Sequence, residues 1–360
     1  MSGDVDVAVV GGGVIGVMTA HEILSRSPGT RLAVLERDAV GQGASRRSAG
    51  LHIPRGATPR VREMTEYSED FYRRLRAADP SVPVTPLPMH VVAPASAAGP
   101  VRERYVRTAA PAPVRELDAP RVRLGPGEAA WRVAGCQYAD VPALVQWLAR
   151  KVRHRADVRE AVAVTGVEPA PGAVRLRLGT GEVLTAGQVV LAPGPWTGGP
   201  AWRDLLAPLE VRVKRVVALH VAAAPAPGDG AVVLEEQDAF LLPLHERGHW
   251  LFSYTSRQWD VDPDAPPRGL TAGQLAEGRD LLRRYAPGLA DRAVSGRVFC
   301  DAYSPDRVPL IQPVDGDGRV LFAGAANGSG YRLAPAVAAA AADRLAPARR
   351  PDPHRERSDR

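Results

Sequence analysis

The stretch that decides the fold is VAVVGGGVIG, residues Val7 to Gly16. An apolar run leads into its glycines and a helical pattern, residues 14–27, follows them, as in a βαβ unit that binds a dinucleotide. Gly11 permits the tight turn off the strand, and Gly13 lets the backbone approach a pyrophosphate. Gly16 lets the helix and the strand pack closely. The sequence therefore predicts a dinucleotide-binding domain at this end of the chain.

The residues after this turn indicate which dinucleotide is bound. The helix begins at Val14 and Ile15, so its free N–H groups and the positive end of its dipole face the phosphates. The next apolar strand ends at Glu36 and Arg37. The Glu36 carboxylate stands where it can accept hydrogen bonds from both ribose hydroxyls of an adenosine, and it would repel a 2′-phosphate. The pattern disfavours NADP.

Length and charge limit the other functions of the chain. With 360 residues, two domains are expected. All but two of the 46 basic residues are arginine, and the 40 acidic residues are interspersed with them. No basic stretch alternates with exposed aromatic residues, so the net charge of +6 does not indicate nucleic-acid binding. An anionic cofactor and substrate account for part of the excess.

Cysteine content and hydropathy give expectations about the compartment. Cys136 and Cys300 are too few and too far apart for a disulfide framework or a metal cluster, so no metal is expected. We find no signal-peptide pattern, and no apolar run approaches the roughly 20 residues that span a bilayer. The sequence thus predicts a cytoplasmic protein without membrane contact. Residues 347–360 combine prolines with dense charge and are expected to form a disordered tail.

Two kinds of sequence alternate along the chain. One kind has βαβ character, with buried apolar strands and amphipathic helices; the other has short alternating strands with many prolines. We expect the first kind to build one discontinuous Rossmann-like domain and the second an inserted, mainly antiparallel β domain. The predicted ranges are 1–86, 139–212 and 300–346 for the Rossmann-like domain, and 87–138 and 213–299 for the inserted one.

Four motifs occur in a characteristic order. They are VAVVGGGVIG with Glu36 and Arg37, GASRRSAG (Gly43 to Gly50), VVLAPGPWT (Val189 to Thr197), and SPDRVPLIQP (Ser304 to Pro313) followed by LFAGAANGSGYRLAPAV (Leu321 to Val337). Together they resemble the D-amino-acid oxidase superfamily of flavoproteins, most closely its glycine oxidase and sarcosine oxidase branch. The resemblance spans nearly the whole chain.

The resemblance implies FAD and a glutathione-reductase-like α/β fold, in which the isoalloxazine lies between the FAD-binding and substrate domains. The last helix opens at a glycine-rich turn, so its N–H groups could stabilise negative charge on the reduced flavin. There is no second GxGxxG, which argues against a pyridine nucleotide as the electron donor. Besides the residues of the first unit, the implied FAD contacts are Gly43, Ala44, Ser45, Arg47, Ala49, Gly50, Leu51, Val164, Ala192, Gly194, Trp196, Gly324, Gly328, Ser329, Gly330, Tyr331 and Arg332.

The chemistry that the resemblance implies is oxidation of a C–N bond, with a hydride equivalent passing to flavin N5 and hydrolysis of the resulting imine. Such a site needs a cation for the substrate carboxylate, a neutral amine and a dry pocket. We therefore expect a glycine-like or N-substituted glycine substrate, with O2 as acceptor. Two alternatives stay open: a D-amino-acid dehydrogenase that uses another electron acceptor, and a flavin-bearing subunit without turnover.

Four residues are candidates for the substrate site. Arg332 aligns with a carboxylate-binding lysine of the sarcosine oxidase branch; the alternative is a solvated arginine at a helix start. His52 and Arg55 lie where that branch carries a second carboxylate-binding arginine, and the alternative is an ordinary loop. Tyr254 could line the pocket, although aromatic residues that alternate on a strand are more often core residues.

Three positions depart from the family pattern. Asp301 stands where glycine oxidases carry a carboxylate-binding arginine, which favours the sarcosine-type arrangement or a substrate amine close to Asp301. Cys300 lies one residue from a cysteine that tethers flavin, and we expect non-covalent FAD. The strand that should carry an oxygen-activating lysine, residues 249–257, has none; Lys214 is the only lysine of the substrate region, and the sequence does not place it relative to the flavin.

Overall fold

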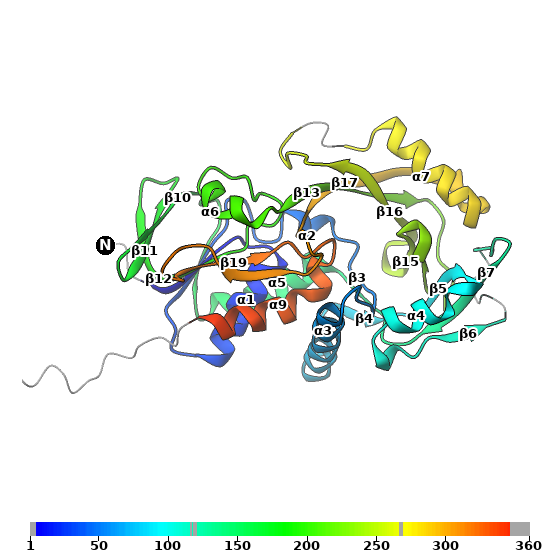
Figure 1. Cartoon of the computed structure of the whole chain (residues 1–360), viewed down its shortest axis with the longest axis horizontal. Helices are drawn as coiled ribbons and strands as arrows, with labels where there is room; N and C mark the ends of the chain where they lie inside the picture. The colour runs from blue at the N-terminus through cyan, green and yellow to red at the C-terminus, as the bar shows by residue number, and fades with distance from the viewer. Residues whose placement is uncertain (1–4, 116, 118–120, 266–268, 346–360) are drawn as a thin grey trace, which may run out of the picture.

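The computed structural model describes residues 5–115, 117, 121–265 and 269–345, and two eight-stranded sheets organise this part of the chain (Figure 1). The predicted fold class, a Rossmann-like α/β unit combined with a mainly antiparallel β unit, is confirmed. The tail predicted for residues 347–360 lies outside the described residues. Within the described ranges, no helix is long and apolar enough to cross a membrane.

The first sheet grows from the glycine-rich unit. Its central parallel strands end in continuous apolar runs, as expected for strands that are buried on both faces. Two antiparallel strands form a hairpin beside them, and one more pairs with the last parallel strand of the chain. The parallel strands are β1 (Val5–Val10), β2 (Leu32–Leu35), β9 (Asp157–Arg159), β12 (Val183–Leu191) and β19 (Val320–Gly324); the antiparallel ones are β10 (Val164–Ala170), β11 (Ala173–Leu178) and β18 (Leu310–Pro313).

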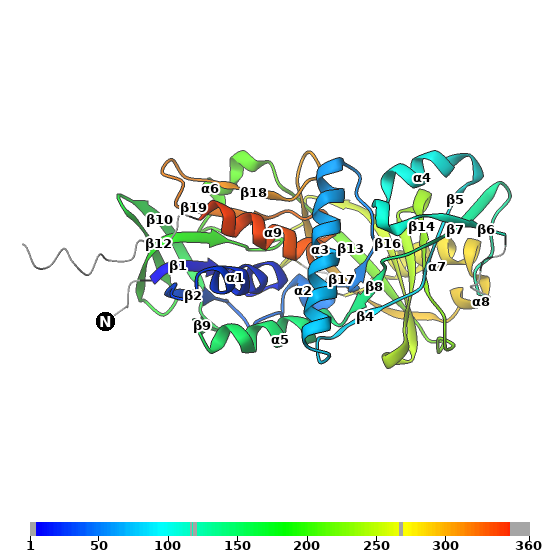
Figure 2. The ribbon, with the colours of Figure 1, turned by 90° about the horizontal axis from the view of Figure 1, so that it is seen from below.

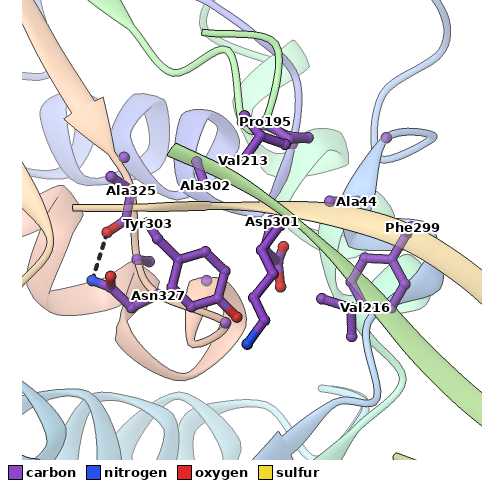
Figure 3. A pocket seen from close by; sticks show the side chains of 18 of the residues that line it. Ala44, Pro195, Val213, Val216, Phe299, Asp301, Ala302, Tyr303, Ala325 and Asn327 are labelled. Atoms are coloured by element: carbon purple, nitrogen blue, oxygen red, sulfur yellow. Dashed lines mark hydrogen bonds between the residues drawn. The ribbon is translucent and has the colours of Figure 1, made fainter. Parts of the chain in front are cut away.

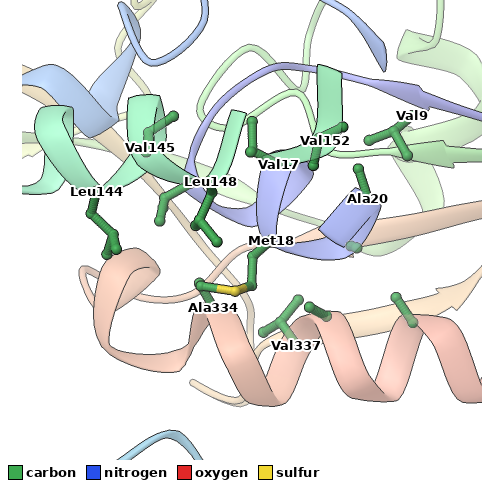
Figure 4. Packing of buried hydrophobic residues seen from close by; sticks show 14 of the residues in the cluster. Val9, Val17, Met18, Ala20, Leu144, Val145, Leu148, Val152, Ala334 and Val337 are labelled. Atoms are coloured by element: carbon green, nitrogen blue, oxygen red, sulfur yellow. The ribbon is translucent and has the colours of Figure 1, made fainter. Parts of the chain in front are cut away.

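Three helices cover one face of this sheet (Figure 2). They are α1 (Val14–Arg26), α5 (Val141–Arg153) and α9 (Gly330–Arg344). Small residues along α9 allow α1 to approach closely, and Met18 of α1 packs beside Ala334 and Val337 (Figure 4). The hairpin β10–β11 and the short helix α6 (Arg203–Leu206) contribute to the apolar cluster on the other face.

One proline in α9 explains a long-range hydrogen bond. Pro335 lies inside the helix and has no N–H to donate to the carbonyl of Tyr331, four residues earlier. The hydroxyl of Tyr72, on α3 (Pro59–Ala78), donates to that carbonyl at 2.7 Å instead. This hydrogen bond takes the place of the missing helical one and holds α3 against the first turn of α9.

The second sheet is antiparallel except for one parallel pair, β14 with β5. The helices α7 (Ala272–Tyr285) and α8 (Pro287–Ala290) pack against one face of its first three strands, while α4 (Ala98–Arg104) belongs to the segment between β5 and β6. The strand order is β17 (Ala293–Tyr303), β13 (Arg212–Val221), β16 (His249–Trp259), β15 (Ala239–Leu244), β14 (Ala231–Leu234), β5 (Met89–Pro94), β7 (Glu128–Val133) and β6 (Ala112–Val114).

A small third sheet has the strand order β3 (Leu51–His52), β8 (Gln137–Ala139), β4 (Val84–Pro86). The predicted boundary at residue 300 falls inside β17, which continues in the second sheet to Tyr303. Residues 300–303 therefore pair with β13 and not with the strands of the first sheet.

Candidate active site

A cavity of about 1470 Å³ lies between the two large sheets. Its walls include the carboxyl ends of β1, β2, β12 and β19, where parallel α/β sheets bind ligands, and parts of β13, β16 and β17. Pockets for one small molecule measure roughly 300–1,000 Å³, so this cavity has room for a dinucleotide and a second molecule.

Most of the predicted site residues line this cavity, and three do not. Gly16 packs helix to strand, since a Cβ there would lie 1.9 Å from the carbonyl oxygen of Gly11. Arg47 is exposed on α2 (Ala44–Arg47) and His52 is buried elsewhere. The predicted residues on the cavity wall are Gly11, Gly13, Val14, Ile15, Glu36, Arg37, Gly43, Ala44, Ser45, Ala49, Gly50, Leu51, Arg55, Val164, Ala192, Gly194, Trp196, Tyr254, Gly324, Gly328, Ser329, Gly330, Tyr331 and Arg332.

The glycine turn leaves backbone groups open at one end of the cavity. Gly11 has a φ of +109°, and a Cβ there would lie 2.3 Å from the carbonyl oxygen of Ala192. Helix α1 begins after Gly13 without a side-chain cap on that residue, although Ser45 Oγ accepts the N–H of Val14 at 2.9 Å. Glu36 accepts the N–H of Gly12 at 2.7 Å with Oε2 and the N–H of Asp38 at 2.9 Å with Oε1, and each oxygen keeps a lone pair for a further donor.

A short segment of the second domain reaches across this end of the cavity. Asp264 accepts a hydrogen bond from the Trp196 indole at 2.9 Å and lies 3.3 Å from the Arg37 guanidinium. The same guanidinium stacks over the Trp196 ring, 4.3 Å from its centre. Sequence reasoning missed this contact, because Asp264 is far from both partners along the chain.

Arg332 presents an uncompensated positive charge to the cavity. Its guanidinium donates to the carbonyl oxygen of Ile53 at 3.0 Å, to that of Arg55, and to Ser329 Oγ at 2.6 Å. Among the described residues, no carboxylate lies within 4.0 Å of it. Burial, together with the nearby charge of Arg55, lowers the pKa of Arg332 to about 9. A bound anion would offset the free-energy cost of burying this positive charge.

Arg55 also lines the cavity, but its charge is already paired. It lies 2.6 Å from Glu235 and 3.7 Å from Asp238. Glu235 is buried and also accepts hydrogen bonds from Arg104 and the Tyr105 hydroxyl, each at 2.7 Å. Burial alone would raise the pKa of Glu235, but these partners outweigh it and lower the pKa. Arg55 is thus held rigidly beside Arg332, and it is a weaker anion site than the sequence predicted.

Asp301 and Lys214 face each other across the β13–β17 pair at the cavity wall. Asp301 points to the same side of β17 as Tyr303 and Phe299 (Figure 3), and burial raises its pKa to about 6. The Lys214 ammonium lies 4.8 Å from the centre of the Trp259 ring and 5.6 Å from that of Tyr303. Burial lowers the pKa of Lys214. The rarity of lysine singles out Lys214 in the sequence, but its place at the cavity wall depends on the pairing of β13 with β17, which joins distant residues.

Two predicted catalytic residues present no polar group to the cavity, so their predicted roles need correction. The Tyr254 hydroxyl donates to the carbonyl oxygen of Gln274 at 2.7 Å, under α7, and only the remainder of Tyr254 borders the cavity. His52 is fully buried with its ring edge-on to Tyr72. Neither ring nitrogen of His52 has a hydrogen-bond partner in the described structure, and burial lowers its pKa to about 3.

Cys300 does not line the cavity, unlike its neighbours Phe299 and Asp301. Successive side chains of β17 alternate between the two faces of the sheet, so the Cys300 thiol faces away from the Asp301 carboxylate. Burial raises the pKa of this thiol. Non-covalent FAD stays our prediction.

A family model described as FAD dependent oxidoreductase (DAO) matches residues 6–344. The chain belongs to this family. The predicted superfamily and the FAD cofactor are therefore confirmed.

This FAD dependent oxidoreductase is 27% identical to a glycine oxidase of Pseudomonas aeruginosa over 94% of the present chain and 93% of that protein. Its fold is similar to that of glycine oxidase from Geobacillus kaustophilus, with a TM-score of 0.77, 20% identity, and 95% and 94% of the two chains covered. It is also similar to NikD, an unusual amino acid oxidase essential for nikkomycin biosynthesis, with a TM-score of 0.79, 18% identity, and 95% and 94% covered.

The residues of this FAD dependent oxidoreductase fit the cofactor. The turn at Gly11 and Gly13 carries no side chain that would block a pyrophosphate, and α1 starts beside it. Helix α9 starts at the opposite part of the cavity, where Ser329 provides no side-chain cap because its hydroxyl binds Arg332. The two helix starts could hold the phosphates and the flavin end of FAD respectively.

Proposed function

We propose that this enzyme oxidises the C–N bond of an amine that carries a carboxylate, a glycine-like or N-substituted glycine substrate, and that it transfers the electrons to O2. The observation that carries the proposal is Arg332, a guanidinium on the cavity wall with no carboxylate partner among the described residues. Buried charges in proteins are normally paired, so the missing partner is best supplied by the substrate. The name of the P. aeruginosa relative, glycine oxidase, supports the same substrate class.

The arrangement of FAD is part of the proposal. Glu36 would bind the adenosine ribose, and the Gly11–Gly13 turn would bind the pyrophosphate. Backbone near Val164, Ala192 and Gly194 lines the path between these groups and the second domain. The turn from Gly328 to Arg332 would contact the pyrimidine end of the isoalloxazine, where the α9 N-terminus favours negative charge.

In this arrangement, the chain's residues orient the substrate and exclude water. Arg332 is held by two backbone carbonyls and Ser329, so its remaining N–H donors have a fixed direction toward a carboxylate. Bound FAD supplies the redox chemistry by accepting a hydride equivalent from the carbon next to nitrogen. Hydrolysis of the imine then gives a carbonyl product and an amine.

The choice of O2 rests on Lys214. Its ammonium lies at the cavity wall over two aromatic rings, and burial lowers its pKa. Reduction of O2 places new negative charge in the site, and a fixed cation stabilises such charge strongly where water is scarce.

A substrate panel tests the proposal. Purified holoenzyme is mixed with glycine, N-methylglycine, larger N-carboxymethyl amines and D-amino acids, while O2 consumption, H2O2 and the products are measured. We expect turnover with at least one carboxylated glycine derivative, with one H2O2 formed per imine hydrolysed. Substrate-dependent flavin reduction without O2 consumption would refute O2 as acceptor, and a panel that leaves the flavin oxidised would refute the substrate class.

A further inference from the structure

The Asp301 carboxylate is a second charged group on the cavity wall without a partner. Neither of its oxygens makes a hydrogen bond or an ion pair with any described residue, and its side chain projects from β17 toward the cavity (Figure 3). A carboxylate removed from bulk water is costly unless a cation or hydrogen-bond donors compensate it. Asp301 thus has an unfilled requirement for a positively charged or hydrogen-bonding ligand.

Lys214 does not meet this requirement. It occupies the position opposite Asp301 in the strand pair, yet no ion pair within 4.0 Å joins them in the described structure. The ammonium instead lies over the rings of Trp259 and Tyr303. Tyr303, a neighbour of Asp301 on β17, keeps its proton because burial raises its pKa, and Asp238 and Arg307 contribute opposite charges nearby. The Asp301 oxygens are left facing the space that a ligand would occupy.

Asp301 and Arg332 flank the same short turn. Oδ2 of Asp301 is 3.9 Å from the position that a Cβ on Gly328 would take, and the Arg332 guanidinium contacts the hydroxyl of the next residue, Ser329. An anionic group and a cationic group therefore border one region of the cavity from two sides. A small molecule with a carboxylate at one end and an ammonium at the other matches both.

We infer that Asp301 binds the cationic nitrogen of the substrate while Arg332 binds its carboxylate, so that the enzyme selects zwitterionic monocarboxylic amines. This inference rests on the proposed function and deepens it. It predicts discrimination against molecules that place a second anion near the nitrogen, because two carboxylates would then meet at Asp301.

The same carboxylate has a second use in the reaction. An ammonium must lose a proton before its neighbouring C–H bond can be oxidised. Asp301 can accept that proton: an N–H bond breaks, an O–H bond forms at Oδ, and nitrogen keeps the electron pair. The raised pKa of Asp301, caused by burial, makes this carboxylate a better proton acceptor than an ordinary aspartate.

A pair of isosteric ligands tests the inference by binding alone. Trimethylglycine and 3,3-dimethylbutanoate share a carboxylate and nearly the same shape, but only the first carries a positive charge. Their dissociation constants are measured with the anaerobic holoenzyme from the change in flavin absorbance. We expect the wild type to bind trimethylglycine about tenfold or more tightly than 3,3-dimethylbutanoate, which lacks the positive nitrogen, and Asp301→Asn to bring the ratio near one.

Two further variants separate the possible failures. Asp306→Asn makes the same chemical change at an exposed turn outside the cavity wall, and it should keep the wild-type ratio. Equal binding of both ligands by the wild type, with Arg332→Met weakening both, would overturn the role of Asp301 and leave the proposed function intact. Binding of neither ligand, or binding that Arg332→Met does not weaken, would overturn the carboxylate site and with it the role of Asp301.

Discussion

Replacing Arg332 by methionine removes the positive charge on which substrate binding depends. The variant keeps an unbranched side chain of similar length, so the start of α9 should survive the change. Truncating one partner of a buried, hydrogen-bonded charge pair costs about 2–5 kcal/mol. Arg332 already donates to Ile53 and Ser329 in the free protein, so part of its hydrogen bonding is not used on the substrate. We therefore expect the lower half of that range, about 2–3 kcal/mol, or about 30- to 150-fold in kcat/KM.

The assay is steady-state oxidation of the best carboxylated amine, with FAD content measured in each preparation. Most of the loss should appear in KM, because the guanidinium contacts the carboxylate in both the bound substrate and the transition state. Arg332→Lys should recover part of the loss, since it restores charge without the two-pronged geometry. Arg102→Met, an exposed site on α4, is the control and should behave as wild type. A kcat/KM for Arg332→Met close to wild type, at full FAD occupancy, would refute the assignment.

Three more predictions concern stability and the flavin. The pKa of His52 is about 3 in the folded chain and near 6.5 in the unfolded chain. Unfolding therefore takes up a proton between these pH values, and the stabilisation from the neutral imidazole is fully present only above about pH 6.5. The loss at pH 5 should be about 2 kcal/mol in denaturant unfolding, and His52→Leu should reduce this pH dependence; identical pH dependence in both proteins would contradict the buried neutral imidazole. Tyr254→Phe should lower stability by about 1 kcal/mol and leave kcat/KM unchanged, because the hydroxyl serves α7; a large kinetic defect would argue against this. Acid precipitation of the wild-type protein should leave a colourless pellet, because non-covalent FAD is released. A yellow wild-type pellet together with a colourless pellet from Cys300→Ser would show that FAD is linked to Cys300.

The sequence was most informative where a local rule governs the backbone. The Gly11–Gly16 turn and Glu36 follow from the geometry of one βαβ unit, so about thirty consecutive residues contain the whole signal. The start of α9 at a glycine-rich turn was readable for the same reason. These features identify the cofactor end of the cavity.

The substrate end was less accessible because its contacts join distant residues. Arg55 and Glu235 are 180 positions apart, and no local pattern indicates that one neutralises the other. For Tyr254, alternation on β16 shows that one face is apolar, but only the packing of α7 reveals that the hydroxyl is directed to this helix and not into the cavity. His52 lies in a two-residue strand, which is too short for any periodicity to indicate burial.

The most direct test of the central claim is an anaerobic titration of the holoenzyme with matched pairs of amines that differ only in the carboxylate, such as N-methylglycine and dimethylamine. The account predicts that the carboxylated member of a pair bleaches the visible flavin absorbance while the other leaves it unchanged at the same concentration. Equal bleaching by both members, or no bleaching by any carboxylated amine, would contradict it.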